Sequence, residues 1–154
     1  MLTNDPQWMP GAAIVLGGEC LRLWAVGHIG LPSRTRDADV ASLIRSGPFQ
    51  YIRNPLYLAN IVMFFGVGLW SGWGWAAAWM FWLALQYHFI VGWEEGVLVK
   101  QLGEPYRDYC EQVSRWIPAR RRAAKGQWQW RTAVRSERST WVAIALVWAA
   151  FWWG

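Results

Sequence analysis

Two short polar clusters next to long apolar runs have residue types that can hold a small ligand. Arg53 and Asn54 stand directly before Pro55, a residue that suits the first turn of a helix. The free N–H groups at such a helix end can bind a carboxylate or another polar group. Glu94 and Glu95 close a later apolar run, where adjacent carboxylates are costly unless solvated, paired or bound to a cation. The acidic pair therefore suits a cationic ligand, unless it simply marks the end of a helix.

The composition of the chain indicates a protein that is surrounded by lipid. Of the 154 residues, 55% are hydrophobic and 15 are tryptophan. The formal net charge is +5, but a nucleic-acid binder would carry its basic residues on a soluble fold, whereas long apolar runs separate them here. We therefore expect no nucleic acid as a partner. The two cysteines, Cys20 and Cys110, give neither a disulfide framework nor metal-ligand spacing, so no metal site is predicted.

Four apolar segments are predicted membrane spans, which makes the fold an all-α integral membrane protein with one domain, residues 1–154. The segments are residues 11–30, 56–70, 73–93 and 140–153. About 20 residues at about 1.5 Å each cross a hydrocarbon core of about 30 Å. The fourth segment is shorter than that, so it either thins the bilayer locally or inserts partway. Ser71 and Gly72 leave only a tight link between the second and third spans, which predicts a helical hairpin.

The basic residues predict how the chain is oriented. Every Lys and Arg except Arg22 lies in one of two loops, residues 32–55 and 94–138. An even number of spans separates these loops, so they share a side, and the positive-inside rule makes that side the cytosol. Both termini are then expected outside, with the bacterial inner membrane as the location. Glu19 and Arg22, three apart in the first span, either pair within the membrane or line the path of a ligand.

The second loop is expected to contain a cytosolic helical segment in two pieces. Gly103 can cap a helix over residues 94–102, and Pro105 can open the next helix. The next helix has an apolar stripe with the spacing i, i+3, i+4 and i+7, formed by Tyr106, Tyr109, Cys110 and Val113. This stripe is predicted to face the membrane or a core.

Taken in order, these motifs resemble the isoprenylcysteine carboxyl methyltransferase and phospholipid methyltransferase superfamily, in its bacterial integral membrane form. The resemblance is carried by residues 47–57 (Gly-Pro-Phe-Gln-Tyr-Ile-Arg-Asn-Pro-Leu-Tyr), Glu94 and Glu95, residues 102–106 (Leu-Gly-Glu-Pro-Tyr) and residues 115–118 (Arg-Trp-Ile-Pro). It covers roughly residues 21–118. No single motif is specific, but the ordered set on one membrane face is.

The resemblance implies S-adenosylmethionine as the cofactor, held between the loop before the second span and the acidic end of the third. The positions that it assigns to the cofactor are Ala41, Ser42, Leu43, Ile44, Phe49, Asn54, Pro55, Leu56, Tyr57 and Glu94. Glu94 corresponds to the carboxylate that grips the charged methionine part. Asn54 replaces the common His of the family, so it can form hydrogen bonds but cannot become cationic. Ile90 replaces an Arg of the eukaryotic prenylcysteine enzymes, so a prenylcysteine carboxylate is not supported as substrate.

The predicted reaction is methyl transfer to a lipid-like or small hydrophobic acceptor at the cytosolic leaflet, with membrane lipids as partners. Its main demands are alignment of the reacting groups and exclusion of water. Arg53, Asn54 and Glu95 are the predicted catalytic residues: the first two hold polar groups of the cofactor. Glu95 or His88 would take a proton from an acceptor that must first lose one.

Two other functions remain open on the sequence. One is an NADPH-dependent membrane reductase of related core fold, which need not carry a Gly-x-Gly-x-x-Gly motif. The other is a non-catalytic membrane scaffold, for which tryptophan belts and basic loops would be sufficient. A scaffold does not explain why the Arg-Asn-Pro and Glu-Glu motifs lie on the same side. The acceptor, the methylated atom and the oligomeric state are not fixed by the sequence.

Overall fold

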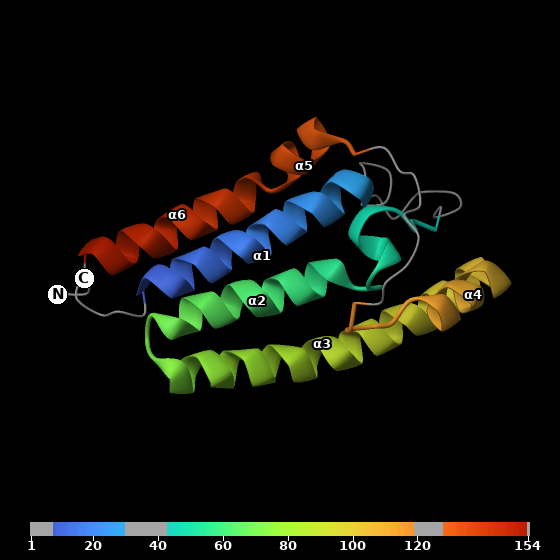
Figure 1. Ribbon diagram of the computed structural model, residues 1–154, viewed down its shortest axis with the longest axis horizontal. Helices are drawn as coiled ribbons and strands as arrows, with labels where there is room; N and C mark the ends of the chain where they lie inside the picture. The colour runs from blue at the N-terminus through green and yellow to red at the C-terminus, as the bar shows by residue number, and fades with distance from the viewer. Residues whose placement is uncertain (1–7, 30–42, 119–127, 154) are drawn as a thin grey trace.

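All regular elements in the described part of the chain are helices. A computed structural model describes residues 8–29, 43–118 and 128–153. The elements, in chain order, are α1 (Trp8–Ile29), η3 (Gly47–Gln50), α2 (Pro55–Leu69), α3 (Trp73–Leu102), α4 (Glu104–Gln112), α5 (Trp130–Ser136) and α6 (Arg138–Trp153). α1, α2, α3 and α6 run lengthwise beside one another, whereas η3, α4 and α5 gather at one end (Figure 1). The all-α prediction is confirmed for these residues.

The helix boundaries follow the signals in the sequence, with one difference. α2 begins at Pro55, and the positive φ of 63° at Gly103 ends α3. The tight link between α2 and α3 contains Gly72, whose φ is 115°. α3 runs without a break for 30 residues, so the predicted third span and the helix predicted over residues 94–102 are one helix. Nothing between Trp93 and Leu102 interrupts helical hydrogen bonding, since the first residue that leaves the helical conformation is Gly103.

Only part of the four-span prediction is supported by length and hydropathy. Among the described helices, only α1 is long and apolar enough over Met9–Ile29 to cross a membrane, and α2 is apolar but shorter. α3 is long, but tryptophans and polar side chains lower its mean hydropathy. Its outer face still carries large exposed apolar side chains: Trp73, Trp75, Trp79, Phe81, Trp82, Leu85, Phe89 and Trp93. A surface of this kind indicates contact with lipid or with another protein.

α1 and α2 pack closely because small residues face each other. A Cβ atom placed on Gly66 would lie 2.7 Å from the carbonyl oxygen of Gly11, and one placed on Gly18 would lie 2.5 Å from Cγ of Met63. Such distances are too short for real atoms, so a larger residue at Gly18 or Gly66 would push the helices apart. Small residues at helix crossings are the usual way in which membrane helices approach closely.

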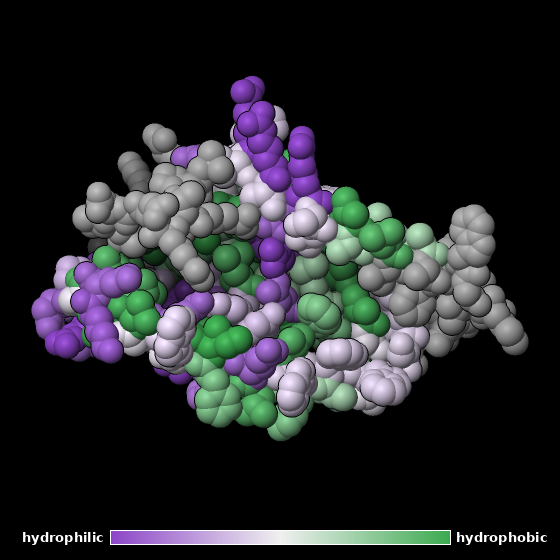
Figure 2. All heavy atoms as spheres, turned by 180° about the vertical axis from the view of Figure 1, so that it is seen from behind, coloured by the Kyte–Doolittle hydropathy of each residue, from purple (hydrophilic) through white to green (hydrophobic). Residues whose placement is uncertain are grey.

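The two predicted loops lie at the same end of the bundle, here called the loop end and formed by residues 43–54, 103–118 and 128–137. The link between α2 and α3, the start of α1 and the end of α6 lie at the opposite end (Figure 1). Hydrophilic residues gather over α4 and α5, and apolar residues cover much of the remaining face (Figure 2). The loops therefore share an end as predicted. Which side of a membrane this end faces stays a prediction.

A small core holds α4 against the loop end. Tyr106, Tyr109 and Val113 are buried in it, and Leu43 and Leu98 are among the residues that pack against them. Cys110, the fourth member of the predicted stripe, is half-buried beside them. Of the two predicted surroundings for this stripe, the membrane or a core, the structure shows a core, which fixes α4 beside the last turns of α3.

Candidate active site

The loop end brings the two predicted polar clusters together. Asn54 precedes α2, and its side-chain nitrogen donates a hydrogen bond to Glu95 Oε1 at 3.3 Å. Tyr57, in the first turn of α2, donates its hydroxyl hydrogen to Glu94 Oε1 at 2.8 Å. These contacts form because the α2–α3 hairpin returns the chain to the level at which α2 begins (Figure 1).

Glu95 lies at the centre of a group of charges, here called the Glu95 cluster: Arg53, Asn54, Glu95 and Arg115. Its carboxylate is 9% exposed and lies 3.3 Å from Nε of Arg53. Nε of Arg115 donates to its other oxygen at 3.1 Å, and the Nη2 atom of Arg115 does so at 2.5 Å. Both oxygens of this carboxylate are therefore in contact with guanidinium groups. The geometry therefore favours a positioning role for Glu95, and the proton-accepting role stays a prediction that nothing here tests.

The segment after α4 completes this cluster. The backbone N–H of Arg53 donates to the carbonyl oxygen of Ser114 at 3.0 Å, so residues 113–118 return to the start of α2. The sequence analysis included Arg115 in a motif but gave it no role. Its partner is 20 positions away in the chain, and no local spacing could have identified it.

Glu94 has a different environment from its neighbour. It is half-buried, and the neutral hydroxyl of Tyr57 is its hydrogen-bond partner. No basic side chain among the described residues forms an ion pair with it. The ring of Tyr57 is held in turn against Tyr87, with ring centroids 4.7 Å apart. Within the described residues, this carboxylate therefore has room for a cationic group.

The backbone N–H groups in the first turn of α2 remain able to bind a ligand. Asn54 is a residue type that often caps helices, yet its side chain makes no capping hydrogen bond and is directed to Glu95 instead. The backbone carbonyl of Asn54 accepts the N–H of Leu58 at 3.2 Å, as in a normal first turn. The side chain of Asn54 therefore does not occupy the first N–H groups of the helix, which face the loop end.

The other predicted cofactor positions lie at the same end where they are described. Ala41 and Ser42 fall outside the described residues, and Leu43 and Ile44 are half-buried. Phe49 lies in η3, and its carbonyl oxygen accepts the hydroxyl of Tyr109 at 2.6 Å. Burial raises the pKa of this hydroxyl well above its usual value, so Tyr109 stays neutral and keeps this bond. Pro55 and Leu56 begin α2.

His88 is not brought to the Glu95 cluster. It is exposed on α3, with its ring edge against Phe89 at a centroid distance of 5.8 Å. Together with Leu58, Ile61 and Trp116 it lines a surface cavity of about 430 Å³. His88 therefore belongs to the surface between α2 and α3, and its proposed role as a base has no support from a contact with the acidic pair.

A second group of charges lies within the helical bundle, here called the Arg22 cluster: Glu19, Arg22, Asn60 and Glu137. Glu19 and Arg22 form an ion pair at 4.0 Å, which was one of the two predicted alternatives. Arg22 also donates to Glu137 Oε2 from Nε at 3.1 Å and from Nη2 at 2.9 Å, and it donates to the side-chain oxygen of Asn60. The hydroxyl of Thr140 donates to Glu137 at 2.8 Å. This cluster joins α1, α2 and the junction of α5 and α6.

Glu137 was missed by the sequence analysis, which assigned it to the second loop. The structure buries it completely. The available signal was its place three residues before the apolar run that begins at Thr140, because a carboxylate close to the end of a membrane span requires a partner or water.

Comparison with known proteins gives one result for this chain. A family model described as phospholipid methyltransferase matches residues 6–105, more than half of the 154 residues. The matched range contains Arg53, Asn54, Glu94 and Glu95, and it ends before Arg115, α5 and α6. No curated protein and no solved structure matches the chain.

Proposed function

The chain belongs to the phospholipid methyltransferase family of membrane methyltransferases, and we propose that it transfers a methyl group from S-adenosylmethionine to a lipid-like acceptor. Membership in the family agrees with the resemblance found in the sequence motifs. The cofactor is the one that the family resemblance implies, and the geometry of the loop end supports it. The apolar surface of the helices supports a lipid-like acceptor.

The observation that carries the proposal is the contrast between the two adjacent carboxylates. Glu95 is already paired with Arg53 and Arg115, whereas the partner of Glu94 within the described residues is the neutral hydroxyl of Tyr57. S-adenosylmethionine carries an ammonium group that fits the free charge of Glu94. The first N–H groups of α2, together with Arg53 and Asn54, suit the polar and anionic edges of the same molecule.

The residues of the loop end would bind and orient the cofactor. The bound cofactor supplies a methyl group on a sulfonium, which a nucleophile displaces in line. The Glu95 cluster fixes Asn54 and the start of α2, so Glu95 and Arg115 are positioning residues in this proposal. The core of Tyr106, Tyr109 and Val113 holds α4 beside the site and limits the access of water.

The acceptor would come from the lipid layer next to the loop end. The exposed apolar face of α3 supports contact of this protein with lipid. With the basic loops in the cytosol, as the positive-inside rule predicts, the acceptor would be a lipid of the cytosolic leaflet and both termini would lie outside. In this proposal the location is the bacterial inner membrane.

The direct test is calorimetric binding of three compounds to the detergent-purified protein: S-adenosylmethionine, S-adenosylhomocysteine and NADPH. We expect the two sulfur compounds to bind and NADPH to give no heat. Binding of NADPH alone would favour a reductase, and the absence of any binding would favour a scaffold. Either result would reject the methyltransferase proposal.

A substitution of Glu94 tests the assignment within the site. In Glu94→Gln the charge is lost while the shape is kept, so affinity for S-adenosylmethionine should fall about 10- to 100-fold, as for the loss of a charged hydrogen bond of about 1.5–3 kcal/mol. Because Glu94 has no ion pair among the described residues, the unfolding temperature should change little. The matched control is Glu104→Gln, at an exposed carboxylate whose partner is Arg107. Equal affinities in the two variants would reject the role of Glu94.

A further inference from the structure

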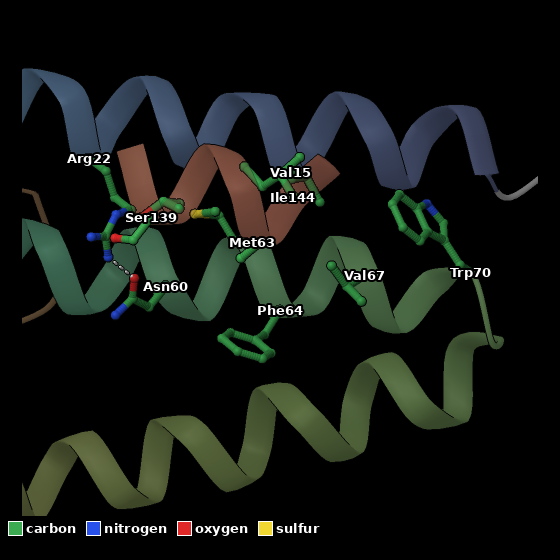
Figure 3. Close-up of a pocket in the computed structure, with 11 residues that line it drawn as sticks. Val15, Arg22, Asn60, Met63, Phe64, Val67, Trp70, Ser139 and Ile144 are labelled. Carbon is green, nitrogen blue, oxygen red and sulfur yellow. Dashed lines mark hydrogen bonds between the residues drawn. The ribbon is translucent and has the colours of Figure 1, made fainter. Parts of the chain in front are cut away.

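A cavity lies between α1, α2 and α6, on a part of the molecule that the proposed cofactor site does not use (Figure 3). Its volume is about 420 Å³, within the range of about 300–1,000 Å³ that is usual for small-molecule sites. Val15, Met63, Val67 and Ile144 give it apolar walls. The cavity therefore has the size and the lining to accept a hydrocarbon chain.

The cavity is polar at one end only. Arg22, Asn60 and Ser139 lie together at one end, and Trp70 lies at the other (Figure 3). The polar end is the one nearer the loop end, because Asn60 follows the start of α2 by five residues, about 8 Å along a helix. A lipid of the leaflet next to the loop end has the same polarity, with its head group toward the loop end and its chain toward the bilayer centre.

A line of contacts connects this polar end with the proposed cofactor site. The side-chain nitrogen of Asn60 donates to the hydroxyl of Tyr87 at 3.2 Å. The Tyr87 ring lies against Tyr57, whose hydroxyl donates to Glu94. A molecule with its head group near Asn60 would therefore lie on the side of the cavity that leads to the proposed site of methyl transfer.

The polar end contains a buried carboxylate without a hydrogen-bond partner. The side chain of Glu19 is 2% exposed, and neither of its carboxylate oxygens has a hydrogen-bond partner among the described residues. Arg22 lies 4.0 Å from it and donates its hydrogen bonds to Glu137 and Asn60 instead. A buried carboxylate of this kind requires a proton or a cationic ligand to balance it. A second anion at this place would increase the cost of burying Glu19.

We propose that this cavity binds the hydrocarbon chain of the methyl acceptor, and that the Arg22 cluster selects neutral or cationic head groups over anionic ones. The inference rests on the proposed function, because it names the site and the class of the acceptor. Ser139, Thr140 and Ile144 line the cavity from α6, which lies outside the range of the family match. The C-terminal helices of this chain therefore complete its acceptor site.

The test compares three amphiphiles that share one saturated chain and carry an amine, a hydroxyl or a carboxylate. Their binding to the full chain is measured by native mass spectrometry at neutral pH, without cofactor. We expect the amine and the hydroxyl to bind at least about 10-fold more tightly than the carboxylate, a difference of about 1.4 kcal/mol. Equal or tighter binding of the carboxylate would overturn the proposed selection.

Two pairs of variants locate the effect. Ala143→Phe fills the cavity from α6 and should weaken binding of all three amphiphiles, whereas Ala145→Phe, on the same helix but outside the lining, should not. Glu19→Gln removes the buried carboxylate that has no hydrogen-bond partner among the described residues, and it should abolish the preference for the amine over the carboxylate. Glu104→Gln, at an exposed carboxylate, should keep this preference. Equal effects within either pair would reject the site.

The amphiphile experiment and the cofactor experiment distinguish a wrong acceptor site from a wrong proposed function. Selective amphiphile binding without affinity for S-adenosylmethionine would leave a lipid site and reject the methyltransferase proposal. Affinity for S-adenosylmethionine without selective amphiphile binding would keep the methyltransferase and reject this acceptor site.

Discussion

The two charged clusters of this protein are opposites in composition. The Glu95 cluster has one carboxylate between two guanidinium groups, whereas the Arg22 cluster has one guanidinium group between two carboxylates. Arg53 and Arg115 are 13% and 30% exposed, so water at the loop end can solvate the excess positive charge. The carboxylates of the Arg22 cluster are almost completely buried, at 2% and 0% exposure. In this cluster the carboxylate of Glu19, which has no hydrogen-bond partner among the described residues, therefore needs a proton or a ligand to balance its charge.

The largest expected effect comes from removing the cation of the Arg22 cluster. Arg22→Met leaves two buried carboxylates without their guanidinium partner, and breaking a buried pair in this way costs about 3–5 kcal/mol. The free energy of unfolding, measured by denaturant titration in detergent, should fall by that amount. The double variant Arg22→Met with Glu137→Gln should recover part of the loss. If Arg22→Met is as stable as the unchanged protein, the ion pairs of Arg22 do not stabilise the fold.

A smaller loss is expected at the loop end. Glu95→Gln removes the carboxylate between Arg53 and Arg115, but both guanidinium groups keep some contact with water, so we expect a loss of about 2 kcal/mol. The same titration measures it, with Glu104→Gln as the exposed control. A loss as large as that of Arg22→Met would contradict the difference in solvation between the two clusters.

The smallest effect is expected from Tyr57, which lies in the line of contacts between the Arg22 cluster and Glu94. Tyr57→Phe removes the hydroxyl that donates to Glu94 but keeps the ring against Tyr87. Loss of one hydrogen bond of about 1 kcal/mol should weaken S-adenosylmethionine binding about 5-fold, because Glu94 is less well oriented. Calorimetry measures this affinity, and Tyr51→Phe, a half-buried tyrosine without a hydroxyl contact to Glu94, is the control. Unchanged affinity in Tyr57→Phe would show that this hydroxyl does not orient the site.

Much of the helical framework could be predicted because its signals are local. Pro55 begins α2, Gly103 ends α3 and a tight link joins the two, and each of these depends on the conformational preferences of the residues present. The convergence of Asn54 with the acidic pair could also be predicted, since a hairpin of two helices brings its open ends together. The length of α3 was not predicted, because an acidic pair was taken as the border of a helix.

Local signals in the sequence were sufficient to predict the start of α2, the hairpin, the common end of the two loops and the residue types of the proposed cofactor site. The packing of the helices was needed to show that Glu95 is buried between two arginines, while Glu94 has no ion pair among the described residues. Adjacent residues point about 100° apart on a helix, so the rotation of α3 against its neighbours fixes their roles. The contacts of Arg115 and Glu137 and the cavity beside α6 also depend on the packing of the helices. Their partners are far away in the chain, and only the packing of the helices brings them into contact.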